Sequence, residues 1–430
     1  MSLLTAALGR ARRMVGGSTG FTTAATLASA PVNLATGIIA ARALSPDGRG
    51  SYAAIFALVT VPGYLASLGS RATVGYFVGS GRATANQMLS VWLVLGLMSS
   101  AVTVGALQLL LPVALAAQSE STLEIARWYS VTVLAVILSE VGAGLLVACK
   151  RPRLFAVAVV AQPLVQLAGY LILLALDSFT VATALTSTTC GFLTPAALGA
   201  WVALQEGFLE IPRPRLMADT ASYGFRSALG GLSSLANQRL DLLVMPSLIG
   251  PVAIGYYAVA SNMAAILVTL GQALSTVFLP AAAAHGTRSD SVALTADTFR
   301  RTVLLAALVG AAAALAAPVV VPLVYGPEFT EVTPLFWILL PGVVLLTGGL
   351  ILIAAIDARG RPGLSSVAQA CGAVVTVAGL AALLKPLGAT GAALVSTFSY
   401  ITTCLVAAVL YSRIAEVPVW RLARLVAQPR

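Results

Sequence analysis

Residues 151–174 read RPRLFAVAVVAQPLVQLAGYLILL, and their pattern indicates how the whole chain is organised. After Arg153, no charged side chain appears before the stretch ends at Leu174. A helix rises about 1.5 Å per residue, so about 20 apolar residues cross the hydrocarbon core of a bilayer. We therefore predict a transmembrane helix that begins at an arginine-rich membrane surface.

The same pattern recurs along the chain and predicts an all-α polytopic membrane protein with twelve transmembrane helices. Nearly every gap between the apolar stretches carries charge, glycine or proline, and the weakest boundary is Gly250-Pro251. The longest predicted loops, about 205–220 and 281–301, are too short for a folded catalytic domain. The predicted spans lie near 20–44, 51–70, 85–116, 126–148, 154–176, 179–204, 221–249, 252–280, 302–324, 333–356, 363–384 and 388–411.

The composition excludes soluble classes of protein. Of the 430 residues, 59% are hydrophobic and 9% charged, whereas soluble domains carry about 25% charged residues. The net charge of +10 would suggest nucleic acid as the partner of a soluble protein. In a membrane protein such cations instead collect in cytoplasmic loops. Soluble enzymes and nucleic-acid-binding proteins are therefore excluded.

The distribution of cations predicts the orientation of the helices. With the amino terminus inside, 20 of the 25 Lys and Arg residues lie on the inner side, and this imbalance predicts that both termini are cytoplasmic. The outer side keeps Arg42, Arg49, Arg127 and Lys385, and Arg239 lies within a span. The inner cations are Arg10, Arg12, Arg13, Arg71, Arg82, Lys150, Arg151, Arg153, Arg213, Arg215, Arg226, Arg288, Arg300, Arg301, Arg359, Arg361, Arg413, Arg421, Arg424 and Arg430.

The two halves of the chain resemble each other. Residues 361–384 read RPGLSSVAQACGAVVTVAGLAALL, which aligns with 151–174 without a gap and is identical at ten of 24 positions. A second internal similarity supports the repeat. Asn33 precedes Gly50-Ser51-Tyr52-Ala53 in the first half, and Asn237 precedes Gly255-Tyr256-Tyr257-Ala258 in the second half. We predict two parallel six-helix repeats, a design typical of transporters. The predicted parts are an N-terminal lobe (1–205), a cytoplasmic linker (206–220), a C-terminal lobe (221–412) and a cytoplasmic tail (413–430).

Five short motifs, in order along almost the whole chain, carry a more specific resemblance. The chain resembles the bacterial polysaccharide exporters, or lipid-linked oligosaccharide flippases, of the superfamily that also holds multidrug extruders and lipid II flippases. The motifs are Ala41–Ala53 (ARALSPDGRGSYA), Asn237–Asp241 (NQRLD), Gly255–Ala258 (GYYA), Tyr325–Phe329 (YGPEF) and Gly388–Tyr400.

The resemblance implies two six-helix lobes around a central cavity that opens to one side at a time. It implies a bacterial cytoplasmic membrane protein that moves an undecaprenyl-pyrophosphate-linked oligosaccharide from the inner to the outer leaflet. The implied partners are this substrate, membrane lipids, H⁺ or Na⁺ as a candidate coupling ion, and other polysaccharide-synthesis proteins. No cofactor, metal or nucleic acid is implied.

Ionisable side chains within spans are costly and usually face the interior or a water-filled cavity. Glu140, Arg239 and Asp241 are of this kind. Asn237 and Asp241 share one helix face, whereas Arg239 points about 160–200° away. Arg239 is a candidate for binding pyrophosphate through bidentate contacts. The alternative is a polar clamp of Asp241 with Arg239 or Asn237 that holds helices together. Glu140 is a candidate either for ion coupling or for an inter-helix hydrogen bond.

The outer ends of the first two spans supply further candidates for the cavity. Arg42 and Arg49 either attract the lipid head group or extend to the interface. Asn33 and Asn237 add amides, and Arg42, Arg49 and Arg239 outnumber the acids Asp241 and Glu140 by one, which predicts a cavity that is net positive in its outer half. The segment from Val417 to the C-terminus is predicted to lie on the inner leaflet as an amphipathic stretch.

Three alternative functions remain open. A multidrug or organic-cation antiporter on the same fold needs acids in the cavity, and the first span has none. An integral-membrane glycan ligase or polymerase needs a large outer loop with catalytic groups. A scaffold without transport does not account for charges at mid-membrane. The four cysteines show no paired or metal-ligand spacing.

Overall fold

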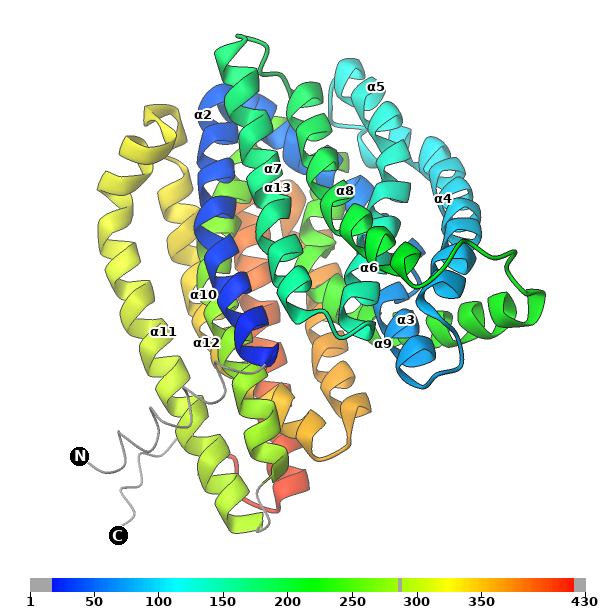
Figure 1. Cartoon of the computed structure of the whole chain (residues 1–430). Coiled ribbons are helices and arrows are strands. Elements are labelled where there is room, and N and C mark those ends of the chain that lie inside the picture. The colour runs from blue at the N-terminus through cyan, green and yellow to red at the C-terminus, as the bar shows by residue number, and fades with distance from the viewer. Residues whose placement is uncertain (1–17, 285–287, 421–430) are drawn as a thin grey trace. The chain divides into compact units, whose positions relative to one another are not determined.

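The computed structural model describes residues 18–284 and 288–420, and all its regular elements there are helical (Figure 1). Short 3₁₀ turns η1, η2 and η3 lie at Ser130–Thr132, Met245–Ser247 and Pro327–Phe329. The α-helices are α2 Ser18–Ala66, α3 Ser70–Gly79, α4 Ala85–Ala114, α5 Glu120–Tyr129, α6 Val133–Ala148, α7 Pro152–Ala175, α8 Val181–Gln205, α9 Pro214–Val244, α10 Pro251–Ala284, α11 Arg288–Tyr325, α12 Val332–Ala358 and α13 Pro362–Ala415.

Within the described ranges, nine helical segments are long and apolar enough to cross a membrane, so the chain is a multi-pass membrane protein. The count of twelve stays a prediction. Two of the nine contain a break: Ser45 in α2 has φ 59° and ψ 174°, and Gly388 in α13 has φ 56° and ψ −133°. Pro46 accounts for the loss of helical geometry at Ser45, because a proline disfavours the helical region for the residue before it, but not for the positive φ. Helix α9 is not among the nine, and its charged residues include Arg226, Arg239 and Asp241.

Two predicted loops are shorter than expected. The first is the gap between the predicted spans 51–70 and 85–116: Arg71 of this gap lies in α3, which begins after positive φ angles at Leu68 and Gly69. The predicted loop 281–301 is helical except for residues outside the described ranges, because α10 ends at Ala284 and α11 begins at Arg288. Hydropathy marks where apolar side chains end, whereas a helix can continue into water with polar ones. The exposed pair Asp297–Arg301, at 2.9 Å and spaced i,i+4, supports such a continuation.

The chain divides into two compact units. Unit 1 holds Met1–Leu44, Ile55–Leu115 and Ser119–Leu229, and unit 2 holds Ser45–Ala54, Ala116–Gln118 and Gly230–Arg430. Only 206–213 of the predicted linker lies outside a helix, because α9 begins at Pro214. The lobe boundaries predicted from the repeat remain predictions. The predicted amphipathic tail lies largely outside the described residues, as do the first inner arginines.

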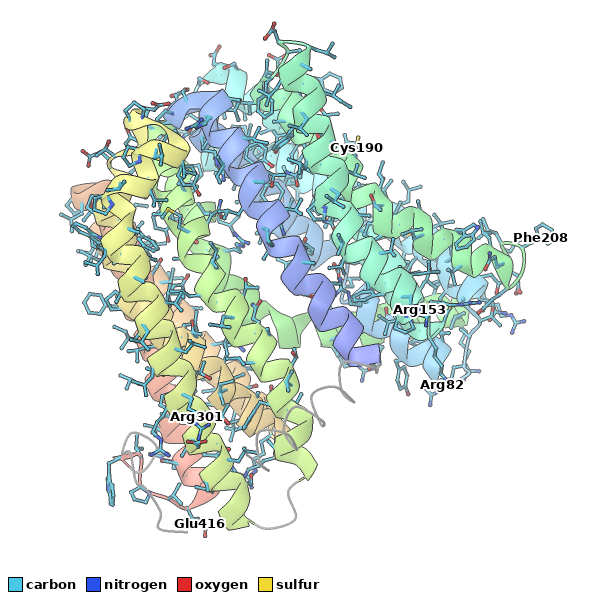
Figure 2. The ribbon with its side chains drawn as sticks, turned by 60° about the vertical axis from the view of Figure 1, so that its left-hand side comes forward. Arg82, Arg153, Cys190, Phe208, Arg301 and Glu416 are labelled. Atoms are coloured by element: carbon cyan, nitrogen blue, oxygen red, sulfur yellow. The ribbon has the colours of Figure 1, made fainter. Side chains whose placement is uncertain are left out.

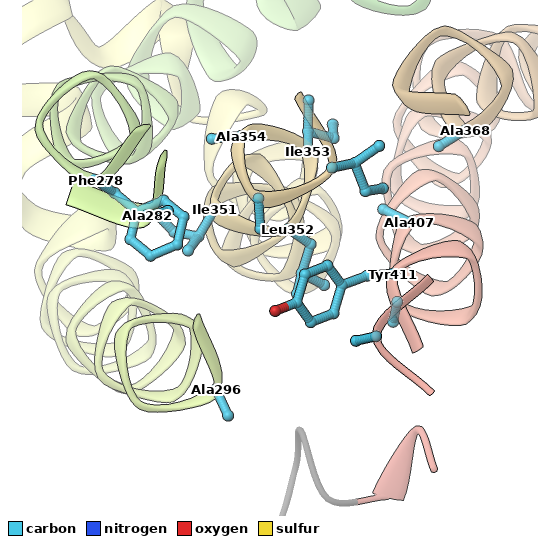
Figure 3. Packing of buried hydrophobic residues seen from close by; sticks show 14 residues of the cluster. Phe278, Ala282, Ala296, Ile351, Leu352, Ile353, Ala354, Ala368, Ala407 and Tyr411 are labelled. Carbon is cyan, nitrogen blue, oxygen red and sulfur yellow. The ribbon is translucent and has the colours of Figure 1, made fainter. Parts of the chain in front are cut away.

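Each unit has its own apolar core. In unit 1, Val136 of α6 packs with Phe192 of α8, and Phe56 of α2 stacks on Phe192 with ring centroids 6.5 Å apart. In unit 2, α12 supplies the central run Ile351–Ile356, and α10, α11 and α13 pack around it (Figure 3). Polar side chains that enter these cores must therefore find partners among the neighbouring helices.

Candidate functional site

The Gly255–Ala258 motif at the start of α10 contacts each of the other four family-like motifs, all within unit 2. A Cβ atom at Gly50 would overlap the carbonyl oxygen of Pro251, and one at Gly255 would overlap that of Pro46. The two backbones therefore touch, and only glycine fits at the contact. The motifs paired in sequence as a repeat are thus packed against each other.

Arg49 is buried at this contact, with 5% of its surface exposed. Its guanidinium carbon lies 5.2 Å from the centroid of the Tyr52 ring, a cation–π contact. Its Nε has no hydrogen-bond partner among the described residues. Arg49 therefore does not extend to the interface, which was one of its two predicted placements. Its role toward a lipid head group stays a prediction.

Aromatic rings join the Tyr325–Phe329 motif to the start of α10. The Phe329 ring lies 6.1 Å from that of Tyr256, edge to face, and 6.2 Å from that of Tyr325. Such pairs are favourable at these separations. The motif after α11 therefore packs on the motif that opens α10.

Asp241 lies in the core of unit 2, 5% exposed, at the centre of a hydrogen-bonded group that we call the Asp241 cluster: Asp241, Tyr257 and Ser396. The Tyr257 hydroxyl donates a short hydrogen bond to Oδ2, and the Leu242 amide donates to Oδ1 at 2.8 Å. The hydroxyl oxygens of Tyr257 and Ser396 are 2.9 Å apart. The cluster ties α9 to α10 and α13.

This geometry matches a clamp between helices, with partners that the sequence reasoning missed. Tyr257 and Ser396 both lie inside quoted motifs, Gly255–Ala258 and Gly388–Tyr400. Their location inside these motifs is the one feature of the sequence that points to Tyr257 and Ser396, because hydropathy does not distinguish a hydrogen-bonded hydroxyl from a free one. The clamp partners proposed from sequence were Arg239 and Asn237.

Arg239 lies two residues before Asp241 and is exposed, so the two charges occupy different surroundings. Among the described residues no ion pair joins them. The side chain of Asn237 lies outside the described part of the chain. Arg239 therefore lies on the exposed side of α9, whereas Asp241 lies in the core of unit 2.

Unit 1 holds the other predicted residues, and it does not bring them together. Glu140 of α6 forms an ion pair with Arg71 of α3 at 3.0 Å, with side chains 22% and 50% exposed. Asn33 and Arg42 are exposed on α2, nine positions apart, which places them on opposite sides of a regular helix. Within 18–284 and 288–420, no three His, Cys, Asp or Glu side chains gather as metal ligands.

Sequence comparison places the chain in a family. Residues 39–334 match the family described as polysaccharide biosynthesis protein. The chain belongs to this family. The matched range contains every motif except Gly388–Tyr400. No curated protein sequence gives a significant match.

The fold is similar to those of solved membrane transporters. The lipid II flippase MurJ, in an inward closed conformation, has a TM-score of 0.76 at 13% identity, covering 94% of this chain and 89% of that chain. A multidrug resistance MATE family transporter of the MOP superfamily, inward-facing, has a TM-score of 0.69 at 16% identity, covering 94% and 100%. A MOP superfamily transporter from Pyrococcus furiosus, whose binding pocket is described as reversed in polarity, has a TM-score of 0.62 at 16% identity, covering 95% and 96%. These identities establish the fold alone, which the chain shares with transporters of the MOP superfamily.

Proposed function

We propose that the chain is a flippase, and not an enzyme, that moves an undecaprenyl-pyrophosphate-linked oligosaccharide from the inner to the outer leaflet of the bacterial cytoplasmic membrane. The observation that carries the proposal is the family match over 39–334 in a chain with the MurJ-like fold. A polysaccharide-biosynthesis protein built from membrane helices is suited to one step of that process, the movement of a lipid-linked oligosaccharide from the inner to the outer leaflet. Alternating access is the mechanism that the fold supports.

The charges on the membrane helices favour an anionic substrate. Arg239 is exposed, whereas the carboxylate of Asp241 is buried and bonded to Tyr257. A guanidinium at membrane depth is costly unless water or an anion meets it. A pyrophosphate supplies that anion and accepts bidentate hydrogen bonds from the guanidinium. Arg239 and Asn237 are the side chains that we assign to substrate, and Arg42, Arg49 and Asn33 stay candidates from the sequence.

A multidrug or organic-cation antiporter is the second candidate, favoured by the structural likeness to MATE transporters. An organic cation needs an available carboxylate in the transport path. Glu140 is paired with Arg71, and Asp241 is held in its cluster. If H⁺ or Na⁺ drives transport and binds at Glu140, it shares the carboxylate with Arg71, which contacts Oε1.

Depletion in the native cell separates the two candidates. If the chain is the flippase, its loss will leave the lipid-linked oligosaccharide in the inner leaflet, unavailable to a membrane-impermeant sugar-modifying reagent, and will leave ethidium accumulation unchanged. Accumulation of ethidium with a normal outer-leaflet oligosaccharide would favour the antiporter.

A further inference from the structure

Unit 1 contains a basic pocket that the proposed transport does not use. It has a volume of about 470 Å³ and lies where the turn between α3 and α4 meets the start of α9. Four arginines line it, and one acid, Asp219, leaves a formal charge of +3 (four minus one). Figure 2 shows Arg82 and Phe208 toward this end of unit 1. The arginines are Arg82, Arg213, Arg215 and Arg226.

Aromatic stacking fixes one wall of the basic pocket. The rings of Tyr76 on α3 and Tyr223 on α9 stack with centroids 4.6 Å apart and planes 7° apart. Next to Tyr223, a Cβ atom at Gly224 would lie 2.5 Å from the carbonyl oxygen of Leu68. The first turns of α9 therefore lie directly on the break between α2 and α3, and their orientation is set by packing.

Hydrogen bonds fix the opposite wall. The segment 206–213 crosses the start of α4, where Asn86 Nδ2 donates to the Phe208 carbonyl at 2.8 Å and Gln87 Nε2 donates to Glu210 Oε2 at 2.9 Å. The Glu210 amide donates to Ser90 Oγ at 3.2 Å. These bonds hold residues 208–210 against the start of α4, and the chain continues from there to Arg213 and Arg215, which line the same pocket as Arg82.

The positive charge in the pocket is not balanced by the protein. Arg82 lies over the Tyr76 ring at 5.2 Å, and Arg226 donates only to Ser222 of its own helix. In the described part of the chain, Asp219 forms no ion pair with any of the four arginines. Helix α9 also begins here, at Pro214, and its free amide groups add partial positive charge. Like charges held together in this way repel one another unless an anion binds between them.

We infer that the basic pocket binds a phosphate-bearing ligand through these arginines and the start of α9. Guanidinium groups and a helix N-terminus both match phosphate oxygens. The volume is that of a small-molecule site and accommodates a phosphate with its attached head group. Such a phosphate comes either from an anionic lipid or from a soluble phosphate ester. The positive-inside pattern places the pocket on the cytoplasmic side, where both are present. The inference does not depend on the proposed transport function.

Binding to the purified full-length protein tests the inference. The probes are inorganic pyrophosphate and dioctanoyl phosphatidylglycerol, measured by calorimetry in an Arg239→Ala background so that the proposed transport site does not contribute, with sulfate at equal ionic strength as reference. The double variant Arg82→Gln/Arg213→Gln should weaken binding at least about tenfold, because it removes two charged hydrogen-bond donors. The control Arg153→Gln/Arg413→Gln removes the same charge at exposed positions outside the pocket and should bind as the unaltered protein does.

If only pyrophosphate binds, the ligand is a soluble phosphate ester. If only the lipid binds, the ligand is an anionic membrane lipid. If both bind, the pocket recognises the phosphate group that they share. The inference is overturned if neither probe binds more tightly than sulfate, or if both double variants lose binding equally. If Arg82→Gln/Arg213→Gln does not fold, Arg226→Gln takes its place under the same criterion, since among the described residues the guanidinium of Arg226 donates hydrogen bonds only to Ser222.

Discussion

Arg239 and Asp241 lie two positions apart in α9, yet the first is exposed and the second is buried among hydroxyl donors. A regular helix turns about 200° over two residues, so one side chain must face away when the other enters the core. This separation favours different roles, and we propose that Asp241 holds α9 in unit 2 whereas Arg239 contacts a ligand.

If Arg239 contacts pyrophosphate, Arg239→Ala should reduce transport by about tenfold or more while the protein inserts and folds normally. Arg239→Lys should restore part of the rate, because it keeps the charge but loses the bidentate contact. The measurement is the initial rate of flipping in reconstituted vesicles, with Arg153→Ala as the control. Normal transport by Arg239→Ala would refute the assignment, and loss of folded protein would indicate a structural role.

The Asp241 cluster makes a separate prediction for stability. Tyr257→Phe removes a hydroxyl that donates to a buried carboxylate, and we expect a loss of about 1–3 kcal/mol of unfolding free energy. Tyr256→Phe is the matched control, since the ring of Tyr256 packs on Phe329 and, among the described residues, Tyr257 rather than Tyr256 donates to Asp241. Thermal unfolding in detergent measures both. Equal melting temperatures for the two variants would show that the cluster does not stabilise unit 2.

The helices could be predicted from sequence because apolar length is a local property, whereas the Asp241 cluster could not. Tyr257 and Ser396 are 16 and 155 positions from Asp241, and no hydropathy pattern indicates which helices pack together. Arg49 was placed near the interface for the same reason. Its burial follows from the contact of the Gly50 backbone with α10, which only the fold reveals. Loop extents failed because four alanines continue α10 to Ala284 and a largely polar stretch begins α11 at Arg288, ahead of its apolar residues.

At the scale of elements, the contact between the α2 break and α10 should be intolerant of any side chain. Gly50→Val would place methyl groups where the Pro251 backbone lies, and we expect destabilisation of about 1–3 kcal/mol or loss of folded protein. Gly37→Val is the control on the same helix, because a Cβ atom there meets nothing within 4 Å. Yield after gel filtration and thermal unfolding report the effect. A stable Gly50→Val variant would mean that the two segments do not touch.

For the whole molecule, the excess of inner cations predicts that the turn between α4 and α5 lies outside and the turn between α3 and α4 lies inside. In a variant without native cysteines, an impermeant maleimide added from outside should label Ser121→Cys and spare Ser80→Cys; both positions are exposed. Permeabilised cells, in which both sites should react, provide the control. The opposite labelling would reverse the topology and place the basic pocket on the outer side.

The central claim is that the chain carries a pyrophosphate-linked glycan between leaflets, and reconstitution tests it most directly. Purified protein is placed in vesicles that contain a fluorescently labelled undecaprenyl-pyrophosphate oligosaccharide, and an impermeant quencher is added outside. We predict that, with the unaltered protein, quenching continues after all labelled lipid initially in the outer leaflet has been quenched. With Arg239→Ala, quenching should stop at that fraction. Quenching that stops at the outer-leaflet share with the unaltered protein, while the same vesicles transport ethidium, would contradict it.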